Sequence, residues 1–241
     1  MPVFSHPPSA PHPVVVEGNT YFKSDWMDTG NDPALSPTVY LVEQGPHISL
    51  RTHFHRNNQF QLFVRGDGVI GKHALSALTV HYAGAYSGYG PLVAGPGGLA
   101  YFTLRSVFET GSLTMVQHAD QMKRGPKRQL HSEPVPVAGE PELAARTEAV
   151  VQDLMPFESD GLGARLYTLP PGAIQTGVDP AGSGGQFYVV LAGSLQVQER
   201  AIEDWGSVFV QATEKPLLFT AGDRGVQVVC LQLPLKAEQY R

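Results

Sequence analysis

The chain has 241 residues, which is enough for one large domain or two modest ones. Only 16% of the residues are charged, while 26 glycines and 20 prolines separate many short apolar runs, a composition typical of all-β proteins with many turns. The formal net charge of −5 disfavours a nucleic-acid partner, although a local positive charge could still bind a small anionic ligand.

The chain carries one cysteine, Cys230, so an intramolecular disulfide is excluded and a reducing compartment is favoured. The amino terminus has neither the basic start nor the apolar core of a signal peptide. Apolar runs also stay shorter than the ~18 residues that a membrane span requires. We therefore predict a cytoplasmic protein that does not enter a membrane.

The first part of the chain predicts structure that leads into a sheet. Residues 1–13 are rich in proline and predict an extended or disordered arm. Residues 14–44 contain short apolar runs that predict lead-in strands, separated by the turn-forming segment Asp28–Pro33.

The most specific pattern lies within the segment Gly45–Gly68. His53 and His55 are two residues apart, so in a strand they project from the same face and can share one metal ion. The run Gln59–Arg65 is rich in aromatic and branched residues and predicts the next strand. If the two strands pair antiparallel, Gln59 could supply a third donor.

This spacing carries a family resemblance. The pattern His53-x-His55-x3-Gln59-x6-Gly66 is similar to the first motif of the cupin superfamily, except that cupins usually carry Glu where this chain has Gln59. The resemblance implies a divalent metal ion held by His53, His55 and Gln59, iron(II) being a common choice in cupins. An amide oxygen is a neutral and weaker donor than a carboxylate, so the ion would be held less tightly.

Further candidates follow in the next segments. Strands are expected at 69–73 and 78–82, where His81 is either an additional metal ligand or a packed residue. Tyr86 and Tyr89 lie in a turn-rich segment close to the mouth of the presumed barrel. Their phenols could orient a ligand, act as acid and base, or simply pack at the rim.

The segment Ala85–Gly98 falls where cupins carry their second motif. Its glycines and prolines are arranged comparably, but no histidine follows Pro91 until His118, so the last histidine ligand of the family pattern is absent. Three protein donors and a water molecule remain an acceptable set for a catalytic metal.

Two arginines are candidates for an inward cation. Arg51 shares the strand parity of His53 and His55 and should face the same way. Arg105 ends the strand expected at 99–104, where it either pairs with a substrate carboxylate or caps the strand as a surface charge. The candidate substrate-binding residues are Arg51, Gln61, His81, Tyr86 and Tyr89.

The chain also contains an internal repeat. A shift of 127 residues places Gln59 on Gln186 and Gly66 on Gly193, in a register without gaps. A repeat of domain-like length indicates two copies of one fold. In the second copy Pro180 replaces His53 and Gly182 replaces His55, so we expect that copy to bind no metal through this motif.

Together with the resemblance, the repeat implies two tandem cupin (jelly-roll) β-barrels, an arrangement called a bicupin. The expected boundaries are 1–118 for the amino-terminal barrel with its lead-in strands, 119–146 for a linker, and 147–241 for a degenerate carboxyl-terminal barrel. The linker should contain a short helical turn starting at Pro141. As in other bicupins, an amino-terminal strand should cover the partner barrel.

Two functions are compatible with this sequence. In the first, the amino-terminal barrel is a metal-dependent enzyme, such as a dioxygenase, isomerase or lyase, that acts on an oxygen-rich small molecule. In the second, the bicupin binds a small-molecule ligand without catalysis. The intact His-x-His pattern favours the first and the missing second-motif histidine favours the second, while the fold alone selects no reaction. The sequence leaves the oligomeric state open, although cupin barrels often pair through sheet edges and the resemblance is thus compatible with a homodimer.

Overall fold

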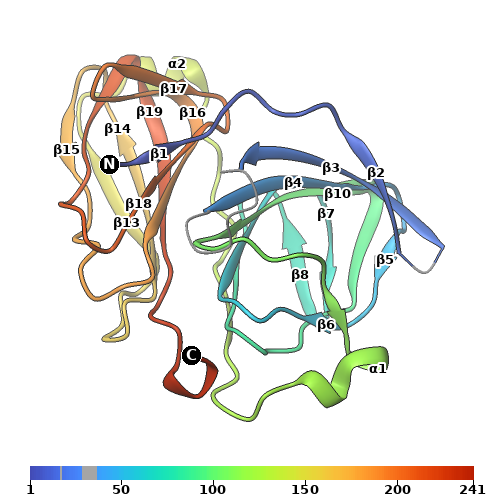
Figure 1. Cartoon of the computed structure of the whole chain (residues 1–241). Helices are drawn as coiled ribbons and strands as arrows, with labels where there is room; N and C mark the ends of the chain where they lie inside the picture. Colours follow the sequence, from blue (N-terminus) through green and yellow to red (C-terminus); the bar gives the residue numbers. More distant parts are fainter. Residues whose placement is uncertain (17, 29–36) are drawn as a thin grey trace. The chain divides into compact units, whose positions relative to one another are not determined.

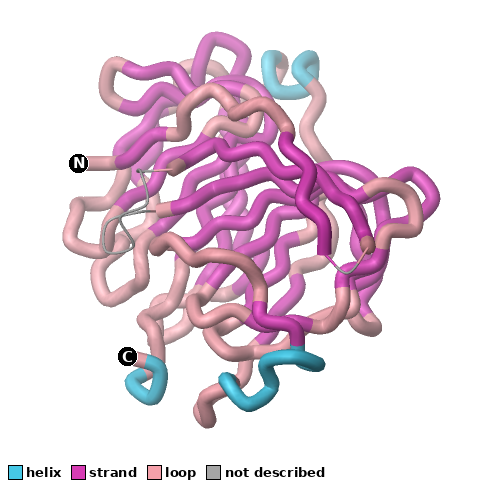
Figure 2. The backbone as a smooth tube through the Cα atoms, turned by 45° about the vertical axis from the view of Figure 1, so that its right-hand side comes forward, coloured by secondary structure: helices cyan, strands magenta, loops and turns pink. Residues whose placement is uncertain are grey.

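The computed structural model describes residues 1–16, 18–28 and 37–241, so the turn predicted at Asp28–Pro33 lies largely outside the described residues. Strands make up 51% of the structure and helices 6%, which confirms a mostly β protein (Figure 2). Two compact units are present. The N-terminal unit comprises residues 7–135 and 236–241, and the C-terminal unit comprises residues 1–6 and 136–235.

The N-terminal unit is built on one antiparallel sheet (Figure 1). Within its described residues, the strand order is β12-β9-β7-β10-β4-β3-β2, with β5 beside β10 and β8 beside β7. The strands are β2 His12–Val16, β3 Asn19–Met27, β4 Thr38–Gln44, β5 Ser49–Leu50, β7 Gln59–Ile70, β8 His73–Ser76, β9 Val80–Ala83, β10 Leu92–Arg105 and β12 Gln129–His131. A separate pair, β6 His53–Phe54 and β11 Leu113–Thr114, precedes α1 Met115–His118 and the 3-10 helix η1 Ala119–Gln121. A last 3-10 helix, η2, spans Glu238–Tyr240.

The C-terminal unit repeats this plan. Its strand order among described residues is β1-β18-β16-β19-β14-β13, with β15 beside β19 and β17 beside β16. The strands are β1 Val3–Phe4, β13 Val150–Met155, β14 Gly163–Leu169, β15 Ile174–Thr176, β16 Gln186–Val197, β17 Arg200–Glu203, β18 Ser207–Val210 and β19 Leu218–Gln232. The helix α2 Glu140–Ala144 begins with Pro141 in its first turn, as predicted. No helix in the described residues is long and apolar enough to cross a membrane.

The structure confirms the repeat at the level of strands. The bounds of β7 and β16 coincide under the 127-residue shift, and β7 pairs with β10 as β16 pairs with β19. Gly66 and Gly193 have positive φ angles of 78° and 76°. A Cβ atom at Gly66 would lie 2.1 Å from the carbonyl oxygen of Gly98, and one at Gly193 would lie 2.2 Å from that of Gly225. Both distances are far shorter than van der Waals contact, so only glycine, which has no Cβ atom, fits. Both copies therefore need glycine for the same close approach of two strands.

The structure places several segments differently from the sequence expectations. The proline-rich arm forms strands at both ends, because β1 pairs with β18 in the C-terminal unit and β2 pairs with β3. The segment 119–146 is divided between the units, since β12 within it pairs with β9 of the N-terminal unit. Strand β10 starts at Leu92, before the expected Leu99, because a shift in register between Ala94 and Leu99 accommodates the intervening glycines.

Alternation along the central strands sorts their side chains onto two faces. On the outer face of β10, Phe102 is fully buried and meets Trp26 edge-on, with 5.2 Å between the ring centroids. On the inner face, Tyr101 packs with Phe63 in an apolar cluster, and the polar residues that follow at the same parity line a cavity. The sheet therefore has one apolar face and one face that becomes polar toward the end of β10.

Candidate functional site

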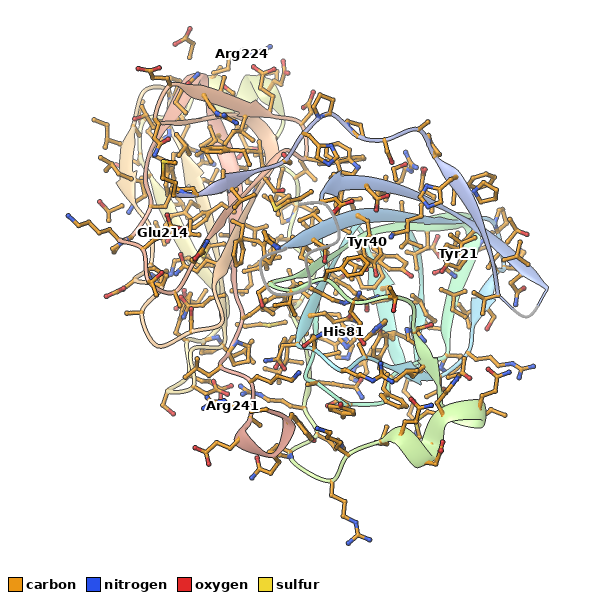
Figure 3. The ribbon with its side chains drawn as sticks, viewed as in Figure 1. Tyr21, Tyr40, His81, Glu214, Arg224 and Arg241 are labelled. Atoms are coloured by element: carbon orange, nitrogen blue, oxygen red, sulfur yellow. The ribbon has the colours of Figure 1, made fainter. Side chains whose placement is uncertain are left out.

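The inner face of the N-terminal sheet lines a cavity of about 260 Å³. Its walls come from β2, β3, β4, β7 and β10 and from the loop that follows β10. Figure 3 labels Tyr21 and Tyr40, which line this cavity, and His81, which does not. Among the sequence-predicted residues, the cavity is lined by Arg51, His53, His55, Gln61 and Tyr89, whereas Gln59, His81 and Tyr86 lie outside its lining.

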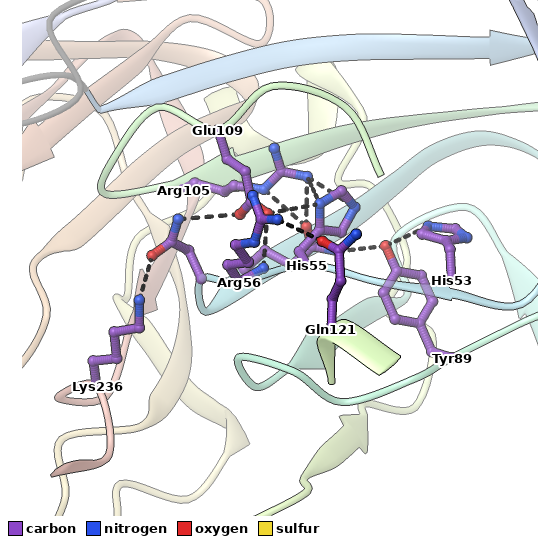
Figure 4. A network of polar contacts seen from close by, with 10 residues as sticks. His53, His55, Arg56, Tyr89, Arg105, Glu109, Gln121 and Lys236 are labelled. Carbon is purple, nitrogen blue, oxygen red and sulfur yellow. Dashed lines mark hydrogen bonds and ion pairs between the residues drawn. The ribbon is translucent and has the colours of Figure 1, made fainter. Parts of the chain in front are cut away.

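Arg105, the last residue of β10, is the central cation of the site (Figure 4). It shares the strand parity of Tyr101 and Thr103, which also line the cavity, and it is only 1% exposed. Its Nε and Nη2 atoms donate to Gln59 Oε1 at 2.9 and 2.8 Å. Nη2 also lies 3.1 Å from each ring nitrogen of His55. A permanently charged guanidinium therefore contacts two of the three predicted metal donors.

A directed chain of hydrogen bonds continues from Gln59. Its Nε2 donates to the Tyr89 hydroxyl at 2.6 Å, and that hydroxyl donates to His53 Nε2 at 2.9 Å. His53 Nδ1 donates to the carbonyl oxygen of Arg51 at 2.7 Å. The guanidinium of Arg105 can only donate and the carbonyl can only accept, which fixes Gln59 Nε2 and His53 Nδ1 as donors. Burial lowers the pKa of His53 to about 4, so at neutral pH the ring carries one hydrogen, on Nδ1, and Nε2 accepts from Tyr89.

Glu109 supplies a negative charge next to this cation. It lies in the loop between β10 and β11, and its side chain is only 6% exposed. Its carboxylate accepts hydrogen bonds from the Arg56 backbone N–H at 2.7 Å and from Asn57 Nδ2 at 3.1 Å, and Oε1 lies 3.7 Å from His55 Nδ1. Lys236 donates in turn to Asn57 Oδ1 at 3.0 Å (Figure 4). Glu109 was not among the residues predicted from sequence, because a loop residue has no strand parity.

Burial sets the protonation states in the site. It lowers the pKa of His53 to about 4 and that of His55 to about 3, and the charge of Arg105 acts in the same direction. Burial alone would raise the pKa of Glu109, but the contact with His55, the charge of Arg105 and the hydrogen bond from the Arg56 backbone bring it down to about 2. At neutral pH the two imidazoles are therefore neutral while Glu109 and Arg105 are charged.

Two of the predicted residues point elsewhere. His81 is fully buried, its Nδ1 donates to Gln61 Oε1 at 2.8 Å, and its ring stacks on His131 with 4.6 Å between centroids. Tyr86 packs in an apolar cluster with Phe54 and Tyr240, because the end of the chain returns to the N-terminal unit. His81 thus holds the side chain of Gln61, which lines the cavity, by a hydrogen bond from outside the lining. Tyr86 does not line the cavity either.

Comparison with solved structures identifies the fold. A variant of oxalate decarboxylase from Bacillus subtilis is similar with a TM-score of 0.62 and 11% sequence identity, over 98% of this chain and 78% of that chain. A candidate dioxygenase from Nostoc punctiforme is similar with a TM-score of 0.57 and 13% identity, over 90% of this chain and 75% of that chain. Both are cupin-fold proteins. The chain has the cupin fold.

The sequence itself matches no protein-family model and no curated protein. At 11 to 13% identity, the solved structures establish the cupin fold and leave the chemistry of this chain to its own residues. The cupin resemblance inferred from the His-x-His motif is thereby confirmed at the level of the fold.

The donor set expected of a metal-binding cupin is arranged here around Arg105. Gln59 Oε1 accepts two hydrogen bonds from the guanidinium, and His53 Nε2 accepts one from Tyr89. Among the described residues, no group of three or more His, Cys, Asp or Glu side chains is arranged to hold a metal ion. A dication ~4 Å from a guanidinium would be repelled by roughly 8 kcal/mol at an effective dielectric constant of about 20. This arrangement does not fit a divalent metal.

The Tyr89 hydroxyl is expected to stabilise the fold, because it is the only link between Gln59 Nε2 and His53 Nε2 within the described residues. Tyr89→Phe should lower the free energy of unfolding by about 1–3 kcal/mol, since two buried groups lose a partner. Tyr86→Phe is the matched control, because its hydroxyl makes no hydrogen bond to the described part of the chain, and its effect should stay within about 0.5 kcal/mol. Urea unfolding measures the free energy of unfolding of both variants. If the two substitutions lower it equally, the hydrogen bonds of the Tyr89 hydroxyl do not stabilise the fold.

Proposed function

We propose that the N-terminal cupin barrel binds a small molecule that carries a carboxylate. The supporting observation is the charge of the cavity, which is lined by Lys23, Arg51 and Arg105, with Glu109 as the one carboxylate lining it in the described part of the chain. Lys23 also pairs with Asp25 at 3.2 Å, outside this lining. Among the described lining residues, cationic side chains therefore outnumber carboxylates, although the net charge of the chain is −5.

Three tyrosines add hydrogen-bond donors to the same cavity. Within the described residues, the hydroxyls of Tyr21, Tyr40 and Tyr101 make no hydrogen bond to the protein, although all three side chains line the cavity. Burial raises the pKa of Tyr21 and of Tyr101, so these phenols stay protonated at neutral pH. Protonated phenols donate to ligand oxygens. A volume of about 260 Å³ lies below that of drug-sized pockets, which favours a small, oxygen-rich ligand.

Calorimetric titration with a panel of small hydroxy acids, keto acids and aromatic carboxylates tests this proposal. At least one acid should bind, and its amide or ester analogue should bind more weakly. Lys23→Gln should weaken binding about five- to tenfold, because it removes a charge from the cavity wall. Lys72→Gln, at an exposed position away from the cavity, is the matched control and should leave the affinity unchanged. If no acid of the panel binds, or if Lys23→Gln and Lys72→Gln weaken binding equally, the proposal is contradicted.

A metal-dependent enzyme is the second candidate. The observation that favours it is the oxalate decarboxylase of Bacillus subtilis, which is similar in fold and has Mn(II) centres. In this candidate His53, His55 and Gln59 hold a divalent ion in the N-terminal barrel, and the reaction is that of a dioxygenase or another metal-dependent cupin. Iron(II) has no specific support from the Mn(II) enzyme and remains a sequence prediction. Oxygen consumption with added iron(II) or manganese(II) and the ligand of the first proposal separates the two candidates.

We also propose that the two units are the barrels of a bicupin, with the C-terminal barrel as a degenerate copy. The repeated pairing of β7 with β10 and of β16 with β19 supports this proposal. The boundaries 1–118, 119–146 and 147–241, the homodimer and the cytoplasmic location remain predictions from sequence.

A further inference from the structure

We infer that Arg105 is a built-in replacement for the metal ion, so that the cation of the N-terminal site is a guanidinium and the barrel works without a divalent metal. Its Nε and Nη2 atoms lie 2.8–2.9 Å from Gln59 Oε1, and Nη2 lies 3.1 Å from the ring of His55. These are the atoms that the cupin motif would offer to an ion. The guanidinium therefore occupies two of the three donors that a metal would use, while the Tyr89 hydroxyl occupies the third, His53 Nε2.

The C-terminal unit contains the same pair of positions without the charge. The 127-residue shift places Gln186 at the position of Gln59 and Gln232 at that of Arg105. Gln186 Nε2 donates to Gln232 Oε1 at 2.5 Å, so the two positions contact each other in both units. The end of β10, like the end of β19, thus delivers its side chain to the glutamine of the neighbouring strand.

The charge appears only in the copy that keeps the two imidazoles. Where Pro180 and Gly182 replace the histidines, a neutral amide pair is enough. Where His53 and His55 remain, the partner of the glutamine is a cation and Glu109 lies next to it. Arg105 therefore occupies a position set by the fold, and its charge replaces the ion that neutral imidazoles and an amide would otherwise hold.

Removing the guanidinium should expose a latent metal site. Arg105→Gln reproduces the amide pair of the C-terminal unit, so Gln59 keeps a partner. The rings of His53 and His55, 5.5 Å apart between centroids, can both reach one ion at about 2.1 Å from each nitrogen. Glu109, in the loop that follows β10, has its Oε1 3.7 Å from His55 Nδ1 and could supply a carboxylate after a movement of its side chain, because the present arrangement of the described residues holds no three-residue metal site.

The test compares wild type, Arg105→Gln and Gln59→Glu, each purified without an affinity tag and titrated with Zn(II) and with Mn(II). Metal content by mass spectrometry and affinity by calorimetry are the readouts. Wild type should contain far less than one ion per chain. Arg105→Gln should bind Zn(II) at least about 100-fold more tightly than wild type, because the repelling charge is gone. The double variant Arg105→Gln/His53→Ala should lose that gain.

Gln59→Glu is the decisive control, because it restores the carboxylate of the cupin motif while Arg105 stays. It should bind no more metal than wild type. A stoichiometric ion in wild type, tight metal binding by Gln59→Glu, or a folded Arg105→Gln protein without a gain in affinity would each overturn the inference. If Arg105→Gln does not fold, the metal content of wild type and of Gln59→Glu still tests the inference, because both proteins keep Arg105 and should therefore bind little metal.

Discussion

Lowering the pH from 7 to 4 should remove most of the stability of the N-terminal unit. Burial lowers the pKa of His53 to about 4, that of His55 to about 3, and that of His81 well below its usual value. In the unfolded chain these imidazoles titrate near pH ~6.5. Between these values the unfolded state binds more protons than the folded state, so stability is present above pH ~6.5 and is lost as the pH falls.

The expected magnitude is large compared with the stability of a domain. A pKa shift of one unit corresponds to about 1.4 kcal/mol. Proton uptake by His53 and His55 in the unfolded chain should therefore lower the free energy of unfolding by roughly 6 kcal/mol at pH 4. Domains are typically stable by only about 5–15 kcal/mol. Glu109, with its pKa lowered to about 2, acts in the same direction at still lower pH, because its stabilising charge is lost as that pH is approached.

Urea unfolding at several pH values measures this effect. The chain has two tryptophans, so in a Trp205→Phe background the fluorescence comes from Trp26 alone, which packs against Phe102 in the N-terminal unit. Stability should fall by about 1.4 kcal/mol per pH unit for each proton taken up on unfolding. His81→Gln should make this dependence shallower, and His47→Gln, at an exposed position, should not. A stability that stays constant from pH 7 to 4.5 would contradict the neutral, buried imidazoles.

Replacing Arg105 by an apolar residue should cost about 3–5 kcal/mol of unfolding free energy, because a buried charge network loses its cation. Arg105→Met leaves Gln59 Oε1 without its two donors and leaves Glu109 without the neighbouring positive charge. Thermal and urea unfolding at pH 7 provide the measurement.

A double-mutant cycle identifies the source of the loss. Glu109→Gln in the Arg105→Met background should recover about 1–2 kcal/mol, because the uncompensated carboxylate is removed. Arg65→Met is the matched control, since Arg65 forms an ion pair with Glu43 but its side chain is 62% exposed, and its loss should stay below about 1 kcal/mol. If Arg105→Met costs no more than Arg65→Met, the buried guanidinium does not hold the site together.

The fold was predictable because its pattern of glycines and strands occurs twice in the sequence, 127 residues apart. Gly66 and Gly193 stand in equivalent positions where only glycine tolerates the approach of the neighbouring strand. The shared glutamines at 59 and 186 begin strands with matching bounds. The division of the segment 119–146 was not predictable, since the pairing of β12 with β9 depends on contacts between residues almost fifty positions apart.

The site was predictable where strand parity applies. Parity placed Arg51, His53 and His55 on one face, and all three line the cavity. Strand parity also puts Arg105 on the same face as Tyr101 and Thr103, and all three line the cavity. Parity therefore predicts that Arg105 points inward, which excludes the second of the two roles considered for it, a surface charge.

Other positions carried no such signal. Glu109 lies in a loop whose path depends on its hydrogen bonds to Arg56 and Asn57. Tyr86 faces Tyr240, a contact that depends on the return of the carboxyl terminus. Both placements follow from tertiary packing, so neither spacing nor composition could have given them.

The most direct test of the claim that Arg105 is the cation of the site is a crystal structure of the wild-type protein grown with excess Zn(II) and recorded at the zinc absorption edge. We predict no anomalous peak between His53 and His55, and an Arg105 guanidinium bonded to Gln59. A zinc peak coordinated by both imidazoles, with Arg105 displaced, would contradict the account.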